Sequence, residues 1–365
     1  MKHILTIALV ALTALMAAGQ PRVSWLEKKH DFGVILEENG KVKCNMRLVN
    51  SGDAPLVIVK VQVGCGCTAI DYPKAPVEPG DTACLTISYN PAGRPGQFTK
   101  QALIFTNTTP KRSILEISGN VIPCEATLDK QYPLRAGALR ISQQNMPFGE
   151  LVKGENKTLF LSAYNASTDT LLVSVSGNRP HIHPAVVPDT VPPAMVTALT
   201  VHYLTAHAPQ WGLNVDTLTL HCQPLRPSAG TMAGAAAINV MAQVIEDFSS
   251  MTEQQRLDAP VVTVDCGDRL DFGNMTSGQV VTRRFVISNR GKTPLNIRRL
   301  WVPQGEGITV STDRIEVKRG KKATVTVTVN TSQLHDSVLN VPLTLQCNDP
   351  VTPRQNIRLV GIIDK

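Results

Sequence analysis

The stretch Lys41-Val42-Lys43-Cys44-Asn45-Met46-Arg47-Leu48 decides the fold class, because polar and apolar residues alternate along it one by one. A period of two places the apolar side chains on one face of an extended chain and the polar ones on the other. The same alternation recurs at residues 82–89 and 324–329, where β-branched residues suit a half-buried strand. The turn signals Pro79-Gly80 and Arg319-Gly320 precede these two stretches. The pattern predicts an all-β fold.

One unit of sequence occurs three times. A Phe-Gly pair begins it at residues 32–33, 148–149 and 272–273, and an asparagine ends the next predicted strand at Asn50, Asn165 and Asn289. The offset from Phe to Asn is 18 residues in the first copy and 17 in the other two. About six to eight short strands in roughly 100 residues are typical of an immunoglobulin-like β-sandwich, and a closed barrel is the alternative. We therefore predict three tandem immunoglobulin-like β-sandwich domains.

The spacing of the copies also predicts the domain boundaries. We expect a signal peptide at residues 1–19, a first domain at 20–123 and a second at 124–247. A polar linker at 248–260, with one helical turn, leads to a third domain at 261–365.

The first residues are typical of a secretory signal. A short basic start precedes the uncharged apolar run 4–16, and Ala17-Ala18-Gly19 supplies small residues for cleavage before Gln20. A retained anchor helix is the alternative, although the run is short for a bilayer span. No other stretch is long and apolar enough to cross a membrane, so we expect an exported chain, periplasmic or on the cell surface.

Charge and motifs restrict the function classes. The formal net charge is +7, and residues 261–365 hold 15 basic and 9 acidic side chains, which could favour an anionic surface or simply form a solvated face. Aromatic residues make up 4% of the chain, so stacking platforms for nucleic acid are scarce. The signatures of hydrolases, zinc proteases, P-loop proteins and dinucleotide-binding enzymes are missing, so we expect no enzyme.

The first copy resembles a known bacterial family, the domain of unknown function 1573 (DUF1573). The residues that carry the resemblance are Phe32-Gly33, Asn50-Ser51-Gly52, Ala54-Pro55-Leu56, Gly64-Cys65-Gly66-Cys67-Thr68, Glu78-Pro79-Gly80 and Gly96-Gln97-Phe98. They cover residues 30–122, whereas the two later copies share only the strand pattern, and Gly64 stands where members usually have Ser. The family is related to the ASPM/SPD-2/Hydin and major sperm protein domains. The resemblance implies exported β-sandwich modules, often in tandem, from Bacteroidetes, and no established activity.

The candidate chemistry lies at Cys65 and Cys67. Gly64 and Gly66 lack a Cβ, which predicts a tight turn that exposes both sulfurs. Two such thiols could form a structural disulfide, ligate copper or zinc, or shuttle between dithiol and disulfide. Cys84 is the candidate third member, because the period of its strand directs it away from the core. The sequence leaves these alternatives open.

A second candidate metal position follows from the repeat. The offset from Asn50 to Cys65, counted from Asn165, ends next to His181 and His183. Two histidines at i and i+2 of an extended chain can face one side and share a metal ion. The alternative is that both are exposed loop residues.

These observations favour a non-catalytic function. We expect an exported multi-domain scaffold or binding protein of the cell envelope, with a protein or envelope component as its partner and no cofactor. The alternative is a metal-handling (copper or zinc) or thiol-redox protein that uses Cys65 and Cys67.

Overall fold

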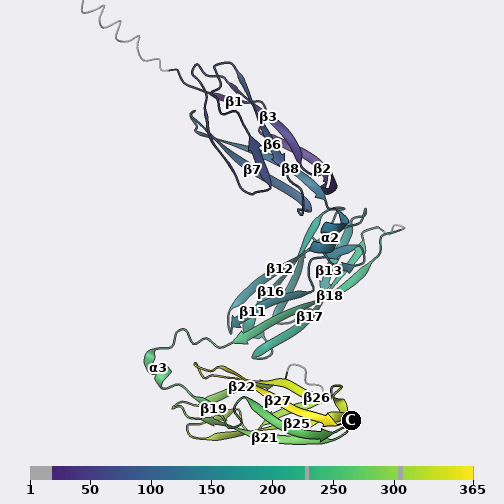
Figure 1. The fold of residues 1–365 in the computed structure, drawn as a ribbon, viewed down its shortest axis with the longest axis vertical. Helices are drawn as coiled ribbons and strands as arrows, with labels where there is room; N and C mark the ends of the chain where they lie inside the picture. The colour runs from purple at the N-terminus through teal and green to yellow at the C-terminus, as the bar shows by residue number, and fades with distance from the viewer. Residues whose placement is uncertain (1–18, 227–229, 303–306, 365) are drawn as a thin grey trace, which may run out of the picture.

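The computed structural model describes residues 19–226, 230–302 and 307–364, which form three β-sandwiches in a row (Figure 1). The expected signal peptide therefore lies, apart from Gly19, outside the described residues. The buried apolar residues form a separate core in each sandwich. The all-β prediction and the immunoglobulin-like architecture are confirmed.

The first domain packs the sheet β1-β3-β6-β5 against the sheet β2-β8-β7-β4. Its strands are β1 (Val23–Trp25), β2 (Lys29–Leu36), β3 (Val42–Asn50), β4 (Ile58–Val63), β5 (Thr68–Asp71), β6 (Thr82–Tyr89), β7 (Gly96–Thr106) and β8 (Arg112–Ile122). The alternation seen in the sequence is the burial pattern of β3, in which Cys44, Met46 and Leu48 are buried.

The second domain packs the sheet β14-β16-β12-β10-β9 against the sheet β11-β18-β17-β13-β15. It begins with helix α2 (Glu125–Gln131), which lies between the first two sandwiches (Figure 1). Its strands are β9 (Leu134–Ala136), β10 (Leu139–Ile141), β11 (Asn145–Val152), β12 (Asn156–Asn165), β13 (Leu171–Ser176), β14 (Ile182–Val187), β15 (Thr190–Val191), β16 (Val196–Leu204), β17 (Gly212–Pro224) and β18 (Gly234–Ile245).

The third domain packs the sheet β19-β21-β25-β23 against the sheet β20-β27-β26-β22-β24. Its strands are β19 (Val262–Val264), β20 (Arg269–Thr276), β21 (Val280–Asn289), β22 (Leu295–Trp301), β23 (Ile308–Thr312), β24 (Glu316–Val317), β25 (Lys322–Asn330), β26 (Val338–Cys347) and β27 (Arg354–Asp364). Helix α3 (Glu253–Leu257) on the connection to this domain begins at Thr252, whose side chain forms a capping box with Gln255.

The repeated Phe-Gly pair marks a β-bulge. In each domain the strand that carries the pair runs parallel to the last strand, β8, β18 or β27, and the register shifts at the pair. Gly33, Gly149 and Gly273 have φ values of 65°, 74° and 72°, a conformation that favours glycine. The sequence repeat is therefore a backbone requirement.

The repeated asparagine ties the two sheets of each domain together. Asn50, Asn165 and Asn289 are all buried, and each amide nitrogen donates to the carbonyl four residues later and to a more distant valine carbonyl. The N–O distances are 2.8 and 2.9 Å for Asn50, 2.7 and 2.9 Å for Asn165, and 2.8 and 2.9 Å for Asn289. Each side-chain oxygen accepts from the backbone N–H two residues later. A buried amide is tolerated here because both its ends are bonded.

Candidate functional site

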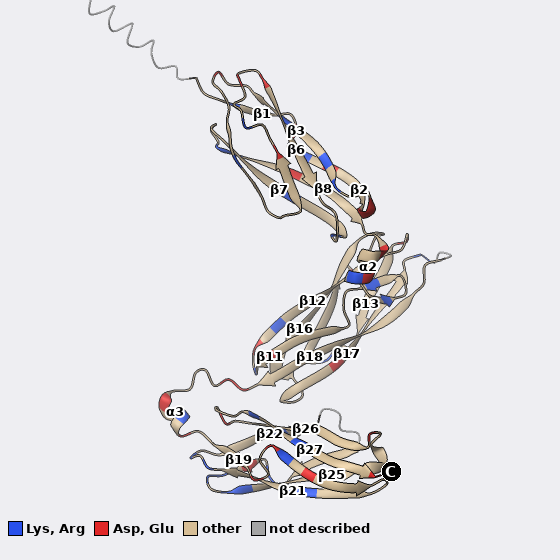
Figure 2. Cartoon of the chain, in the orientation of Figure 1, with Lys and Arg blue, Asp and Glu red and all other residues tan. Residues whose placement is uncertain are grey.

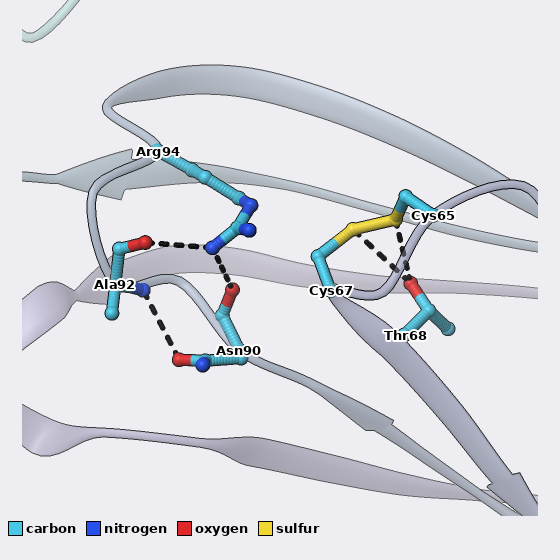
Figure 3. Close-up of a disulfide and its surroundings, with 6 residues drawn as sticks. All are labelled: Cys65, Cys67, Thr68, Asn90, Ala92 and Arg94. Atoms are coloured by element: carbon cyan, nitrogen blue, oxygen red, sulfur yellow. Dashed lines mark hydrogen bonds between the residues drawn. A yellow bond between two sulfur atoms is a disulfide. The ribbon is translucent and has the colours of Figure 1, made fainter.

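Cys65 and Cys67 form a disulfide with each other in the loop between β4 and β5 (Figure 3). Their Cα atoms are 5.3 Å apart, Cys67 is buried in the core of the first domain, and Cys65 is half-buried. Both sulfurs lie 3.7 Å from the hydroxyl oxygen of Thr68. The chain turns at residues 66–67, but Cys67 is 4% exposed, so the expectation that both sulfurs are exposed is wrong. Gly64 and Gly66 have no positive φ, and a Cβ on either would meet no atom within 4 Å, so this turn does not require glycine.

The disulfide loop contacts a second loop, residues 90–95, that follows β6. The backbone N–H of Asn90 donates to the carbonyl of Cys67 at 2.9 Å. Within this second loop, the Arg94 guanidinium donates to the carbonyl oxygens of Ala92 at 2.7 Å and Asn90 at 3.5 Å (Figure 3). The disulfide therefore restrains the β4–β5 loop, and the hydrogen bonds of Arg94 restrain the neighbouring loop after β6.

Residues 90–95 also join the first domain to the second. The carbonyl of Gly93 accepts a hydrogen bond from the Gln131 side chain of α2 at 2.8 Å. The backbone N–H of Gly93 donates to the Glu37 carboxylate at 2.7 Å. The same carboxylate accepts from the Thr127 hydroxyl at 2.7 Å and from the N–H of Cys124 at 2.9 Å. Glu37 thus bridges both domains.

The electrostatics of Glu37 fit this role. Partial burial raises the pKa of its carboxyl, but the hydrogen bonds from Gly93, Thr127 and Cys124 outweigh burial and lower the pKa below its ordinary value. Hydrogen bonds to the charged form favour that form, so Glu37 holds the junction as a carboxylate.

Helix α2 is fixed to the second domain by apolar and ionic contacts. Leu128 and Tyr132 pack with Tyr164 in a small buried cluster. The guanidinium of Arg140, whose side chain is 5% exposed, lies 2.7 Å from the Glu125 carboxylate and 3.0 Å from that of Asp129. Two carboxylates of the helix compensate the buried charge of Arg140, so loss of these contacts would leave a buried ion unpaired.

The second and third domains meet through arginines of β22. Arg298 forms two hydrogen bonds with the Glu246 carboxylate, at 2.7 and 3.0 Å. One guanidinium nitrogen of Arg299 donates to the carbonyls of Trp211 at 3.0 Å and Leu213 at 2.6 Å, and burial lowers the pKa of Arg299. These bonds join residues that are 52 to 88 positions apart in sequence.

A second group of contacts at the same junction is closely packed. The Gln346 amide donates to the carbonyl of Val244 at 2.9 Å. A Cβ on Gly212 would lie 2.7 Å from the ring of Trp301, so only glycine fits there. Trp211 and Trp301 therefore contribute to the interface between these domains.

Cys84 does not lie with the cysteine pair, which corrects the prediction of a shared site. Thr68 pairs with Tyr89 at the end of β6, and Cys84 lies five residues before Tyr89 on that strand. At about 3.3 Å per residue the separation is about 16 Å, too far for one metal ion or one disulfide. Cys84 is an exposed free thiol.

His181 and His183 do not share a site either. A backbone bridge between Arg179 and Ile182 turns the chain just before β14, so the alternation of strand faces begins only after His181. His181 is buried, and its Nε2 lies 2.9 Å from the Asp216 carboxylate. His183 is exposed on β14 and pairs across the sheet with His202, not with His181.

The remaining charges and ligating groups add no further cluster. Lys and Arg are interspersed with Asp and Glu over all three domains (Figure 2). Among the residues that the structure describes, no group of three or more His, Cys, Asp or Glu could hold a metal ion. No helix in the same part of the chain has the length and apolarity that a bilayer span requires.

Comparison with known families agrees with this geometry. Residues 23–121 match the family described as "Protein of unknown function (DUF1573)", and residues 262–361 match the "HYDIN/CFA65/VesB-like, Ig-like domain". The resemblance of the first copy to DUF1573 is confirmed, and the third copy is similar to a described group of immunoglobulin-like domains. No curated protein matches the chain at a significant level.

Several solved structures are similar to parts of the chain. A protein of unknown function from Porphyromonas gingivalis is 18% identical with a TM-score of 0.48, and the match covers 62% of this chain and all (100%) of that one. A PapD-like domain of human CEP192 is 14% identical with a TM-score of 0.27, covering 32% and 92% of the two chains. A three-domain fragment of titin is 12% identical with a TM-score of 0.19, covering 95% and 98%.

Proposed function

We propose that this chain, whose first domain matches DUF1573, is an exported, non-catalytic scaffold or binding protein of the cell envelope. It acts in the periplasm or on the cell surface, and its partner is a protein or another envelope component. Immunoglobulin-like domains commonly mediate protein interactions, which supports a binding role.

The observation that carries the proposal is the construction of the two junctions. Domains joined by a bare linker move relative to each other by default. Here Glu37 and Arg140 fix α2 between the first two domains, and Arg298 and Arg299 fix the third domain to the second. Such contacts hold the three sandwiches in a fixed arrangement. A scaffold needs a fixed spacing between its binding surfaces, whereas independently acting domains do not.

Export is supported by the sequence and by the cysteine pair. The uncharged apolar run 4–16 followed by Ala17-Ala18-Gly19 has the form of a cleavable signal. A bonded Cys65–Cys67 pair fits an oxidising compartment such as the periplasm. Mass spectrometry of the protein from fractionated native cells tests this, and we expect a mature chain that begins at Gln20 in the envelope fraction.

A solution-scattering experiment tests the scaffold. We expect wild-type protein to fit one arrangement of domains, and the double variant Arg298→Met/Arg299→Met to give a distribution of distances between domains two and three. Arg284→Met, an exposed arginine in the same domain, is the matched control. Cosedimentation with native envelope fragments then measures binding. A wild-type chain as flexible as the double variant, or equal binding by both, would overturn the scaffold role.

A thiol-redox function is the second candidate, favoured by the half-exposed Cys65 bonded to the buried Cys67. A thiolate of an external dithiol would attack the Cys65 sulfur, and Cys67 would leave as a thiolate that takes up a proton. The second thiol of the reductant would then release Cys65, so that two electrons pass to this protein. The reduced pair could ligate copper or zinc.

The double variant Cys65→Ser/Cys67→Ser separates the two functions. A scaffold keeps its binding to envelope fragments and loses about 2–5 kcal/mol of stability in the first domain at most. A redox or metal-handling protein stays folded and loses thiol exchange with a dithiol reductant or binding of copper(I). Retained exchange in the variant would exclude the pair as a redox site.

A further inference from the structure

The edge of β6 in the first domain is only partly covered. The edge strand β5 pairs Thr68 with Tyr89 and Asp71 with Thr86, and β6 begins four residues earlier, at Thr82. Residues 82–85 therefore have β3 on one side and no strand of the described chain on the other.

The ladder on the covered side shows which backbone groups face the open side. The N–H of Asn50 donates to the carbonyl of Asp81 at 3.0 Å, so alternate residues from Asp81 onward bond to β3. Bonding alternates along an antiparallel strand, so the N–H and C=O groups of Thr82 and Cys84 point away from β3. Among the residues that the structure describes, neither has a backbone partner on that side.

Proline ends the pairing at this position. The register that places Asp71 opposite Thr86 places Pro73 opposite Cys84, and β5 ends at Asp71. Pro73 has no N–H to donate to the Cys84 carbonyl, and the residue before a proline is restricted as well. The chain leaves the sheet here, and Val77 then forms an isolated antiparallel bridge with Leu56, which precedes β4.

The two other domains cover the equivalent position. In the third domain Thr324 takes the place of Cys84, and Asp313 bonds to both of its backbone groups, at 2.8 and 3.1 Å. In the second domain the equivalent residue, Ala198, pairs with Val187 of β14. The uncovered backbone of Cys84 is thus specific to the first domain, whereas Val196 and Lys322, the equivalents of Thr82, lie beyond the strand pairing in the other two domains.

The open edge borders a hollow of about 580 Å³. Asp71, Tyr72, Pro73, Val77, Asp81 and Cys84 line it. Asp71 and Asp81 are both exposed, and neither forms a salt bridge with any described residue. The Lys74 ammonium lies 3.2 Å from the centroid of the Tyr72 ring.

We propose that residues 82–85 of β6 accept an extended segment of a partner protein as an added strand, with a Lys or Arg of that segment facing Asp71 and Asp81. Main-chain bonds to Thr82 and Cys84 would hold the segment, and the hollow would select its side chains. An uncovered edge normally invites non-specific pairing, and a short edge flanked by proline and two carboxylates limits it to basic segments. The inference rests on the proposed binding function and names its partner class.

Peptides of about ten residues, selected from a random phage-displayed library against the full chain, test the proposal. We expect binders rich in Lys or Arg that slow alkylation of Cys84 about tenfold or more at saturation. Methylating alternate backbone nitrogens of a binder removes its donors to the edge, and should weaken binding about tenfold. Asp71→Asn/Asp81→Asn should weaken it several-fold.

Cys84→Pro, which removes the backbone donor, should abolish binding, and Cys84→Ser should preserve it. Circular dichroism of both variants checks folding, and the N-methylated peptides test the same bonds on wild-type protein. Binders that leave Cys84 alkylation unchanged, or that tolerate N-methylation, overturn the proposal. The proposal is also overturned if the wild-type protein forms a dimer that Cys84→Pro dissociates, because a second copy of this chain then pairs with residues 82–85. Undiminished binding of Cys84→Pro to envelope fragments overturns this site and leaves the scaffold role intact.

Discussion

Replacing the buried asparagine of one domain should destabilise that domain alone. Asn289 is 1% exposed, and its amide nitrogen donates to the carbonyls of Thr293 at 2.8 Å and Val317 at 2.9 Å. Its oxygen accepts from the N–H groups of Gly291 at 2.9 Å and Val261 at 3.3 Å. Asn289→Ala therefore removes four hydrogen bonds and leaves four backbone groups without that partner.

The magnitude follows from those four bonds. At about 1 kcal/mol per net hydrogen bond, the loss is about 4 kcal/mol, and buried groups that water cannot reach raise it. A domain of this kind is stable by about 5–15 kcal/mol, so the variant folds but opens far more often. Asn289→Asp keeps the size and the acceptor but loses both donors, and should be at least as destabilised.

Hydrogen exchange resolved by mass spectrometry measures the effect in each domain separately. We expect faster exchange in β21, β25 and β26, with β3 and β12 of the other domains unchanged. Asn274→Ala, an exposed asparagine in the same domain, is the control and should change stability by less than about 0.5 kcal/mol. If Asn289→Ala costs no more than this control, the asparagine network does not hold the sheets together.

Three further predictions concern the junctions. Arg298→Met should weaken the interaction between domains two and three by about 2 kcal/mol, because its charge-assisted hydrogen bonds to Glu246 are lost. A double-mutant cycle with Glu246→Gln that gives no interaction energy between the two residues would contradict this. Gly212→Ala should loosen the same junction, because φ is 78° and the new Cβ would lie 2.7 Å from Trp301. Solution scattering should show that the two domains separate in this variant. The control Gly278→Ala, where φ is 83° but a Cβ would meet no neighbouring atom, should leave the domain arrangement unchanged. Folding lowers the pKa of the Glu37 carboxyl, so this group stabilises the folded protein fully at pH values above its ordinary pKa of 4.5. That stabilisation is lost as the pH falls through the lower pKa of the folded state. Exchange in α2 should therefore rise on acidification in wild type and depend less on pH in Glu37→Gln.

The sequence by itself determined the strands, the number of domains and their family resemblance. The strands follow from a local rule, because the period of two along residues 41–48 fixes a strand and its buried face. The Phe-Gly pair was visible as a repeat, and the structure supplied its reason, a bulge with a positive φ. The recurring asparagines at 50, 165 and 289 were visible as a repeat, although their reason, a bonded amide between two sheets, was not.

Only the tertiary structure decided which distant residues meet. His183 faces His202 because two strands pair in one register, and a turn at residues 179–182 removes His181 from that face. Cys84 is separated from Cys65 and Cys67 by the length of β6, which a count along the chain does not show. The junction contacts of Glu37 and Arg299 join residues 86 to 90 positions apart. A periodic pattern determines where a side chain points, but its partner depends on how sheets and domains pack.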